Sequence, residues 1–120
     1  MKNQALYLQD ILERIARLLI IADEGKAAFL DSFILQDAMI RNFEIIGEAV
    51  KQLTPTLTSR RPEIAWKSIS GFRDVLIHDY AKVDLEVVWA ACIEQLPSLK
   101  IAVSALLDSL SDENSLTDRE

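Results

Sequence analysis

Apolar residues recur at helical spacing through four segments of the sequence, and this periodicity limits the possible folds more than any other feature. In each segment the apolar positions follow the i, i+3, i+4, i+7 pattern of an amphipathic helix, and no segment alternates apolar and polar residues as a strand would. Proline, glycine and capping residues separate the segments. The sequence therefore predicts an all-α, up-and-down bundle of four main helices, at about residues 4–23, 32–53, 65–78 and 84–110.

The chain is long enough to form one domain with its own core. It has 120 residues, half of them apolar, and a formal net charge of −6. We expect residues 1–110 to form a single helical domain and residues 111–120 to form an acidic, flexible tail. The connection at residues 54–64 contains two prolines and leaves room for one short helical turn.

Composition also bears on cofactors and location. Cys92 is the only cysteine, which excludes an intrachain disulfide, and with a single histidine it makes a weak metal site. We expect no metal and no other cofactor. The first residues lack the apolar core of a signal peptide, and there is no uncharged run of about 18 apolar residues. We therefore expect a cytoplasmic protein that does not contact a membrane.

The second predicted helix is apolar around most of its circumference. Its polar residues fall on one narrow stripe, which leaves an apolar arc of about 240°. Such a helix must be covered on more than one side. We expect a second copy of the chain to supply part of that cover, in a homodimer with this helix near the interface. The polar stripe consists of Asp37, Arg41, Glu44, Glu48 and Lys51.

One polar residue, Asn42, lies within the apolar arc of the same helix. A buried amide that makes no hydrogen bond costs about 1 to 3 kcal/mol, so its side chain must find a partner. The amide could bond to neighbouring backbone and fix the register of the helix, or it could line a polar cleft. The sequence leaves both interpretations open.

The only histidine of the chain stands in the pattern Arg73-x4-His78-x-Tyr80. A purely structural reading is open, in which His78 caps a helix C-terminus, Arg73 is a surface charge and Tyr80 covers the core. On a regular helix, Arg73 and His78 would project about 140° apart and could not form a compact group. All three side chains can converge on one cleft only if the helix ends near His78.

An arginine and a histidine together can support RNA cleavage without a metal. The guanidinium is a permanent cation whose fork fits phosphate, and imidazole exchanges a proton near neutral pH. A single histidine serves only one of the two proton transfers well, so the second must come from another subunit or from Tyr80. Asp74 and Asp79 are most simply explained as solvated or as partners of Arg73, but either could also hold the arginine or the histidine in place and line the cleft. Although the chain is acidic overall, residues 60–82 hold five basic and three acidic side chains.

The motif Arg73-x4-His78-x-Tyr80 resembles the Arg-x4-His-x-Tyr signature of the HEPN superfamily. It is most similar to the HepT-like toxins, which pair with a minimal, MntA-like nucleotidyltransferase as antitoxin. The likeness covers about residues 4–110 and is carried by the segments 7–11, 41–49, 66–80 and 83–89.

This resemblance implies a HEPN-like homodimer whose two motifs face a shared cleft, and a metal-independent ribonuclease activity that is toxic to the bacterial host. It also implies neutralisation by a partner nucleotidyltransferase that transfers AMP to Tyr80. By position, Arg73 would bind or stabilise the scissile phosphate, and His78 would be the general acid or base. Asn42 becomes a candidate cleft residue from its helical phase alone.

Two further interpretations compete with a ribonuclease toxin. The chain could be a non-catalytic helical dimer that docks a nucleotidyltransferase and presents Tyr80 as the acceptor. It could also be a plain dimerisation domain, in which Arg73, His78 and Tyr80 have no role beyond the fold.

Overall fold

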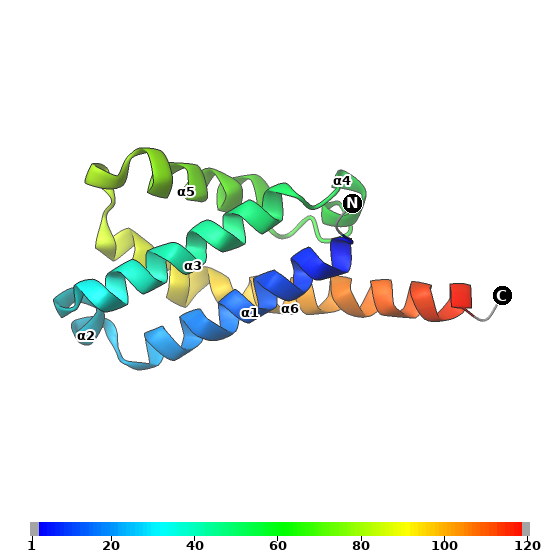
Figure 1. The fold of residues 1–120 in the computed structure, drawn as a ribbon, viewed down its shortest axis with the longest axis horizontal. Helices are drawn as coiled ribbons and strands as arrows, with labels where there is room; N and C mark the ends of the chain where they lie inside the picture. The colour runs from blue at the N-terminus through cyan, green and yellow to red at the C-terminus, as the bar shows by residue number, and fades with distance from the viewer. Residues whose placement is uncertain (1–2, 119–120) are drawn as a thin grey trace.

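The chain folds into a bundle made entirely of helices, as the sequence predicts. The computed structural model describes residues 3–118, and this part of the chain contains no strand. Four long helices run alternately up and down the bundle, with the two chain ends toward the same side (Figure 1). The elements are α1 (Gln4–Asp23), α2 (Lys26–Asp31), α3 (Phe33–Lys51), α4 (Pro55–Thr58), α5 (Trp66–His78), the 3₁₀ turn η1 (Tyr80–Lys82) and α6 (Leu85–Asp118).

Local sequence signals account for the helix boundaries. The side chain of Ser32 accepts a hydrogen bond from the backbone N–H of Leu35 at 3.2 Å and so caps the start of α3. After α1, Gly25 adopts a φ of 94°, which is costly for any residue with a side chain. Thr54 caps α4 at 3.3 Å, and Pro55 occupies its first turn, where a missing N–H is tolerated.

Two boundaries differ from the prediction. The short helix α2 lies between the first two predicted helices, where the sequence analysis had none. The helix α6 continues to Asp118 instead of ending near residue 110, so residues 111–118 are helical, while residues 119–120 lie outside the described part. An exposed ion pair between Arg60 and Glu113, at 2.8 Å, joins this extension to the segment after α4.

The helix α3 occupies the centre of the bundle. It packs against α1 on one side and α5 on the other, and it also contacts α2 and α6, while α1 lies against α6. The chain itself therefore covers most of the apolar arc of α3, so this arc no longer argues for a second copy of the chain. Exposed apolar residues of α3 remain only near its start, at Phe33 and Ile34.

The last helix, α6, supplies one wall of the core. From Leu85 to Glu113 it is long and apolar enough to cross a membrane by length and composition alone. Its packing offers a simpler explanation, because one side of the helix is buried in the bundle. The buried side chains of α6 are Val88, Ala91, Cys92, Leu96, Leu99, Ala102, Val103 and Leu106.

Candidate active site

Helix α5, which carries the predicted motif, is held to α3 along one face. Phe72 meets Phe43 of α3 edge-to-face, with ring centroids 5.5 Å apart, a geometry worth about 0.5 to 1.5 kcal/mol beyond the area it buries. Leu76 is 1% exposed. At the start of the helix, the indole N–H of Trp66 donates to the carbonyl oxygens of Thr58 and Arg61, each at 3.1 Å. These contacts fix the face of α5 that looks onto α3.

The two helices approach most closely where Arg73 crosses α3. A Cβ atom added to Gly47 would lie 2.2 Å from the Cβ of Arg73 and 3.3 Å from the carbonyl oxygen of Ile69. No real side chain fits at the first of these distances. Gly47 is therefore the residue that lets the backbone of α5 come near enough for Arg73 to lie along α3.

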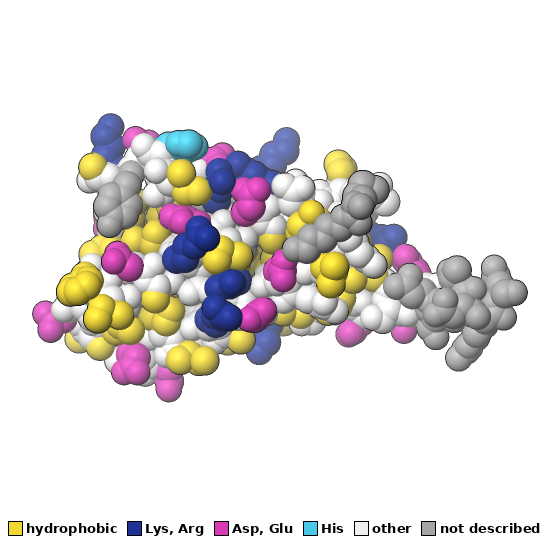
Figure 2. All heavy atoms as spheres, viewed as in Figure 1, with side chains coloured by type: hydrophobic (Ala, Val, Ile, Leu, Met, Phe, Trp, Pro, Cys, Tyr) yellow, Lys and Arg dark blue, Asp and Glu magenta, His cyan; other side chains and the backbone are white. Residues whose placement is uncertain are grey.

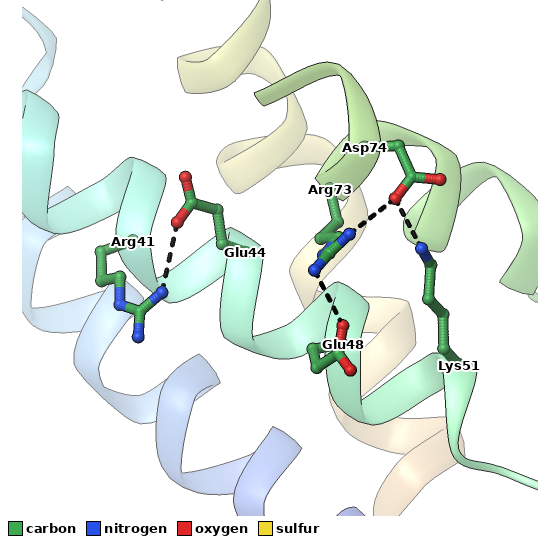
Figure 3. Close-up of polar contacts among 6 residues, drawn as sticks. All are labelled: Arg41, Glu44, Glu48, Lys51, Arg73 and Asp74. Atoms are coloured by element: carbon green, nitrogen blue, oxygen red, sulfur yellow. Dashed lines mark hydrogen bonds and ion pairs between the residues drawn. The ribbon is translucent and has the colours of Figure 1, made fainter. Parts of the chain in front are cut away.

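Two carboxylates hold the guanidinium of Arg73 (Figure 3). Its Nη2 lies 3.1 Å from Glu48 Oε2 on α3, and its Nη1 lies 3.0 Å from Asp74 Oδ1 on α5. Lys51 of α3 binds the same Asp74 oxygen at 2.5 Å. The hydrogen bond from Lys51, and after it the one from Arg73, keeps the pKa of Asp74 below its ordinary value of 3.8. The four residues form a compact cluster with no net charge.

Arg73 also borders a pocket. This pocket has a volume of about 480 Å³ and lies between α1, α3 and α5. The Nε of Arg73 is buried and makes no hydrogen bond to any residue that the structure describes. The other polar side chains around the pocket come from Tyr7, Asp10, Arg41, Glu44, Glu48 and Gln52.

The polar stripe of α3 thus has a structural role that its sequence pattern does not reveal. Two residues of the stripe, Glu48 and Lys51, contact the Arg73–Asp74 pair of α5. One turn earlier on the stripe, Arg41 pairs with Glu44 at 3.3 Å (Figure 3). Sequence reasoning had marked the stripe but had not assigned Gly47, Glu48 or Lys51 to the site.

His78 does not share this pocket with Arg73. It is the last residue of α5, and its side chain is exposed. Helix α5 ends at His78, as predicted, but it stays regular up to that residue. The side chains of Arg73 and His78 therefore remain on opposite sides of the helix. Within one chain, therefore, the expected convergence of Arg73 and His78 does not occur. The backbone of Tyr80 begins η1, and its side chain lies outside the described part of the structure.

The remaining predicted site residues lie apart from the pocket. Asn42 is 7% exposed, donates to the carbonyl oxygen of Ala38 at 2.7 Å and accepts from Arg14 of α1 at 3.4 Å. These bonds fit the structural reading of this residue. Asp79 is the C-cap that follows α5 and is exposed, and its backbone N–H donates to the carbonyl oxygen of Val75 at 2.9 Å.

The surface around the site mixes charges of both signs. Figure 2 shows Lys and Arg side chains crossing this face from α5 over α3 to α1, with acidic side chains among them. Among the residues that the structure describes, no group of three or more His, Cys, Asp or Glu side chains could hold a metal ion. The lone Cys92 is 1% exposed, and burial raises the pKa of its thiol to about 11. This thiol is therefore poorly suited to act as a nucleophile.

Comparison with known proteins identifies the family. The family model described as ribonuclease HepT-like matches residues 8–106, which include the whole of α5. The chain is 35% identical over 111 residues to a protein of Caldanaerobacter subterraneus subsp. tengcongensis named as a putative RNase, covering 89% of this chain and 96% of that protein. The chain belongs to the HepT-like ribonuclease family, as the resemblance of its motif had implied.

Two further relatives have similar names. A protein of Thermococcus cleftensis named as a probable ribonuclease HepT is 39% identical over 98 residues, covering 78% of this chain and 86% of that protein. A protein of Methanocaldococcus jannaschii named as gamma-glutamylcyclotransferase and putative RNase is 37% identical over 114 residues. That alignment covers 94% of this chain and 51% of the relative, so the chain spans about half of its length. No solved structure matches the chain.

Proposed function

We propose that this protein is a ribonuclease toxin that cleaves RNA without a metal ion, using Arg73 and His78. The observation that carries the proposal is the match of residues 8–106 to the HepT-like ribonuclease family. The clamped guanidinium of Arg73 beside a pocket supports it, because a fixed cation at a solvent-accessible pocket suits a phosphate group.

The chemistry follows from the two side chains. The 2′-hydroxyl oxygen of the substrate attacks the adjacent phosphorus, the bond to the 5′-oxygen breaks, and a cyclic 2′,3′-phosphate and a 5′-hydroxyl result. His78 takes the 2′-hydroxyl proton or gives a proton to the leaving 5′-oxygen. Arg73 stabilises the charge that accumulates on the phosphorane oxygens.

A homodimer would complete this site. His78 and Arg73 of one chain lie on different sides of α5, and each chain supplies one histidine for two proton transfers. An apolar groove of about 220 Å³ also opens between α5, η1 and the start of α6. Its floor includes Phe72 and the buried Leu76, and its rim includes the exposed side chains of Val75 and Val87, which a second copy of the chain would cover.

The first experiment measures cleavage of single-stranded RNA by the purified, unmodified protein in excess chelator. Arg73→Ala and His78→Ala should each lower the rate by about 100-fold or more, because each removes a group that acts in the transition state. Wild-type rates in both variants would exclude the proposal.

Mixing the two inactive variants tests the shared site. If Arg73 of one subunit works with His78 of the other, a mixed dimer of Arg73→Ala and His78→Ala chains retains one intact pair. Such mixtures should recover activity, up to about half of the wild-type value per mixed dimer. No recovery despite exchange of subunits would show that each site uses one chain only.

Control of the toxin would come from a partner nucleotidyltransferase in the cytoplasm, where both RNA and ATP are present. The Tyr80 oxygen would attack the α-phosphorus of ATP, release pyrophosphate and lose its proton, leaving AMP on the tyrosine. Intact mass after co-expression should show one added AMP per chain, and none in Tyr80→Phe.

The alternative is a non-catalytic dimer that docks this nucleotidyltransferase. One observation favours it, namely that Glu48 and Asp74 already neutralise Arg73. A stable complex with the nucleotidyltransferase, together with intact RNA in the cleavage assay, would support the alternative over the toxin.

A further inference from the structure

We infer that Glu48 is a positioning residue, which holds the guanidinium of Arg73 in the orientation needed to stabilise the transition state. The inference rests on the proposed ribonuclease function and deepens it. Glu48 of the polar stripe of α3 would thus act in the reaction through Arg73, without touching the RNA phosphate itself.

Two consecutive residues of α3 define both ends of the Arg73 side chain. Gly47 leaves the space that brings the Cβ of Arg73 against α3, since a Cβ on Gly47 would lie only 2.2 Å away. Glu48 then binds Nη2 at the far end of the side chain, at 3.1 Å. A long side chain with many rotamers is thereby confined before any substrate arrives.

The clamp leaves the guanidinium free to bind an anion. A guanidinium has five N–H donors, and the contacts to Glu48 and Asp74 use one nitrogen each, Nη2 and Nη1. The Nε has no partner among the described residues, but it is buried, so the donors open to a phosphate are the remaining N–H groups of Nη1 and Nη2. The side chain of Arg73 is 22% exposed, so a phosphate in the pocket can reach it without displacing the carboxylates.

The neighbouring pair on α3 shows what an unclamped arginine looks like. Arg41 binds Glu44 at 3.3 Å, its side chain is 69% exposed, and this contact is an ordinary i,i+3 pair within one helix. The Arg73–Glu48 pair instead joins two helices, and a second carboxylate holds the other nitrogen (Figure 3). Only the second arrangement holds the guanidinium from two sides, by an ion pair to Glu48 and a hydrogen bond to Asp74.

The test compares single-turnover cleavage by Glu48→Gln, Glu48→Ala and Glu48→Asp at saturating protein. If Glu48 orients Arg73, the cleavage rate should fall by about tenfold to a hundredfold in the Ala variant, since small misplacements of catalytic groups have effects of this size. The Gln and Asp variants, which keep an oxygen acceptor, should lie between Ala and wild type. The Kd for a non-cleavable RNA should change less than about threefold, because the lost interaction concerns the chemical step.

Glu13→Gln is the matched control. It removes the same charge from an exposed glutamate–arginine pair, with Arg17 at 2.8 Å, on the outer side of α1. Its cleavage rate should equal that of wild type. All Glu48 variants should fold, because this side chain is 52% exposed, and circular dichroism verifies it.

A double-mutant cycle separates positioning from a general structural effect. In an Arg73→Lys background the guanidinium fork is absent, so Glu48→Ala should lower the rate by less than about threefold. An equal loss in both backgrounds would overturn the inference, as would a Glu48→Ala variant as fast as wild type or faster. A faster variant would mean that Glu48 masks Arg73. None of these results contradicts the proposed ribonuclease function as long as Arg73→Ala is inactive.

Discussion

The two faces of helix α5 differ in how completely one chain determines them. The face toward α3 carries Arg73 and the buried Leu76, and Glu48 of α3 and Asp74 of α5 hold the guanidinium of Arg73. The opposite face carries Gly71, the half-exposed Val75 and the exposed His78. The arginine is therefore set in place by the fold of a single chain, whereas the surroundings of the histidine are not.

Truncating one apolar side chain on each face should give the largest contrast. Leu76→Ala removes a side chain that is 1% exposed and should lower the free energy of unfolding by about 2 to 5 kcal/mol. Val75→Ala, at a residue that is 47% exposed, should change it by about 0.5 kcal/mol or less. Urea denaturation of both variants measures the difference. A large loss in Val75→Ala would mean that a second chain already covers the outer face.

The same contrast can be made with the two helical glycines. Gly47→Ala should lower the free energy of unfolding by about 1 to 3 kcal/mol, because α3 and α5 must move apart to admit the new methyl group. Gly71→Ala should raise it by about 0.5 to 1 kcal/mol, because its Cβ would meet no atom within 4 Å and alanine favours a helix. Urea denaturation should show changes of opposite sign in the free energy of unfolding of the two variants. A loss of similar size in both variants would contradict this contrast.

The sequence predicts the helices of this fold well because their signals are local. Periodicity and caps place α1 at residues 4–23 and end α5 at His78, as the structure has them. The extension of α6 was missed because residues 111–118 are too polar to show an apolar face. The hydrogen bond of Asn42 to the carbonyl of Ala38 was among the expected outcomes, since an amide in a helix can reach back one turn.

The arrangement of helices around the candidate site could not be predicted in the same way. Helical phase shows that Glu48 and Lys51 share a stripe, but not that Arg73 and Asp74 of α5 lie against it. That contact depends on a close approach between α3 and α5. Gly47 permits this approach, but a glycine in the sequence does not show that a second helix packs against it. The apolar arc of α3 likewise suggested a second subunit, because the sequence could not show that α1 and α5 cover it.

Asp74 links the packed face of α5 to the polar stripe of α3. Of the substitutions proposed here, its replacement should change the stability of the fold least. Because Lys51 and Arg73 bind its carboxylate, its pKa in the folded protein lies below the unfolded value of 3.8. Its contribution to stability is therefore fully present above that value, and it is lost as the pH falls through the lower folded pKa.

Wild type should exceed Asp74→Asn in stability by a constant amount at neutral pH, and the gap should close in acid below pH 3.8. The gap should also shrink in about 1 M salt, which screens an exposed cluster. Thermal melts from neutral to acid pH measure it, and a gap that widens in acid would show that the carboxylate is not bound by cations in solution.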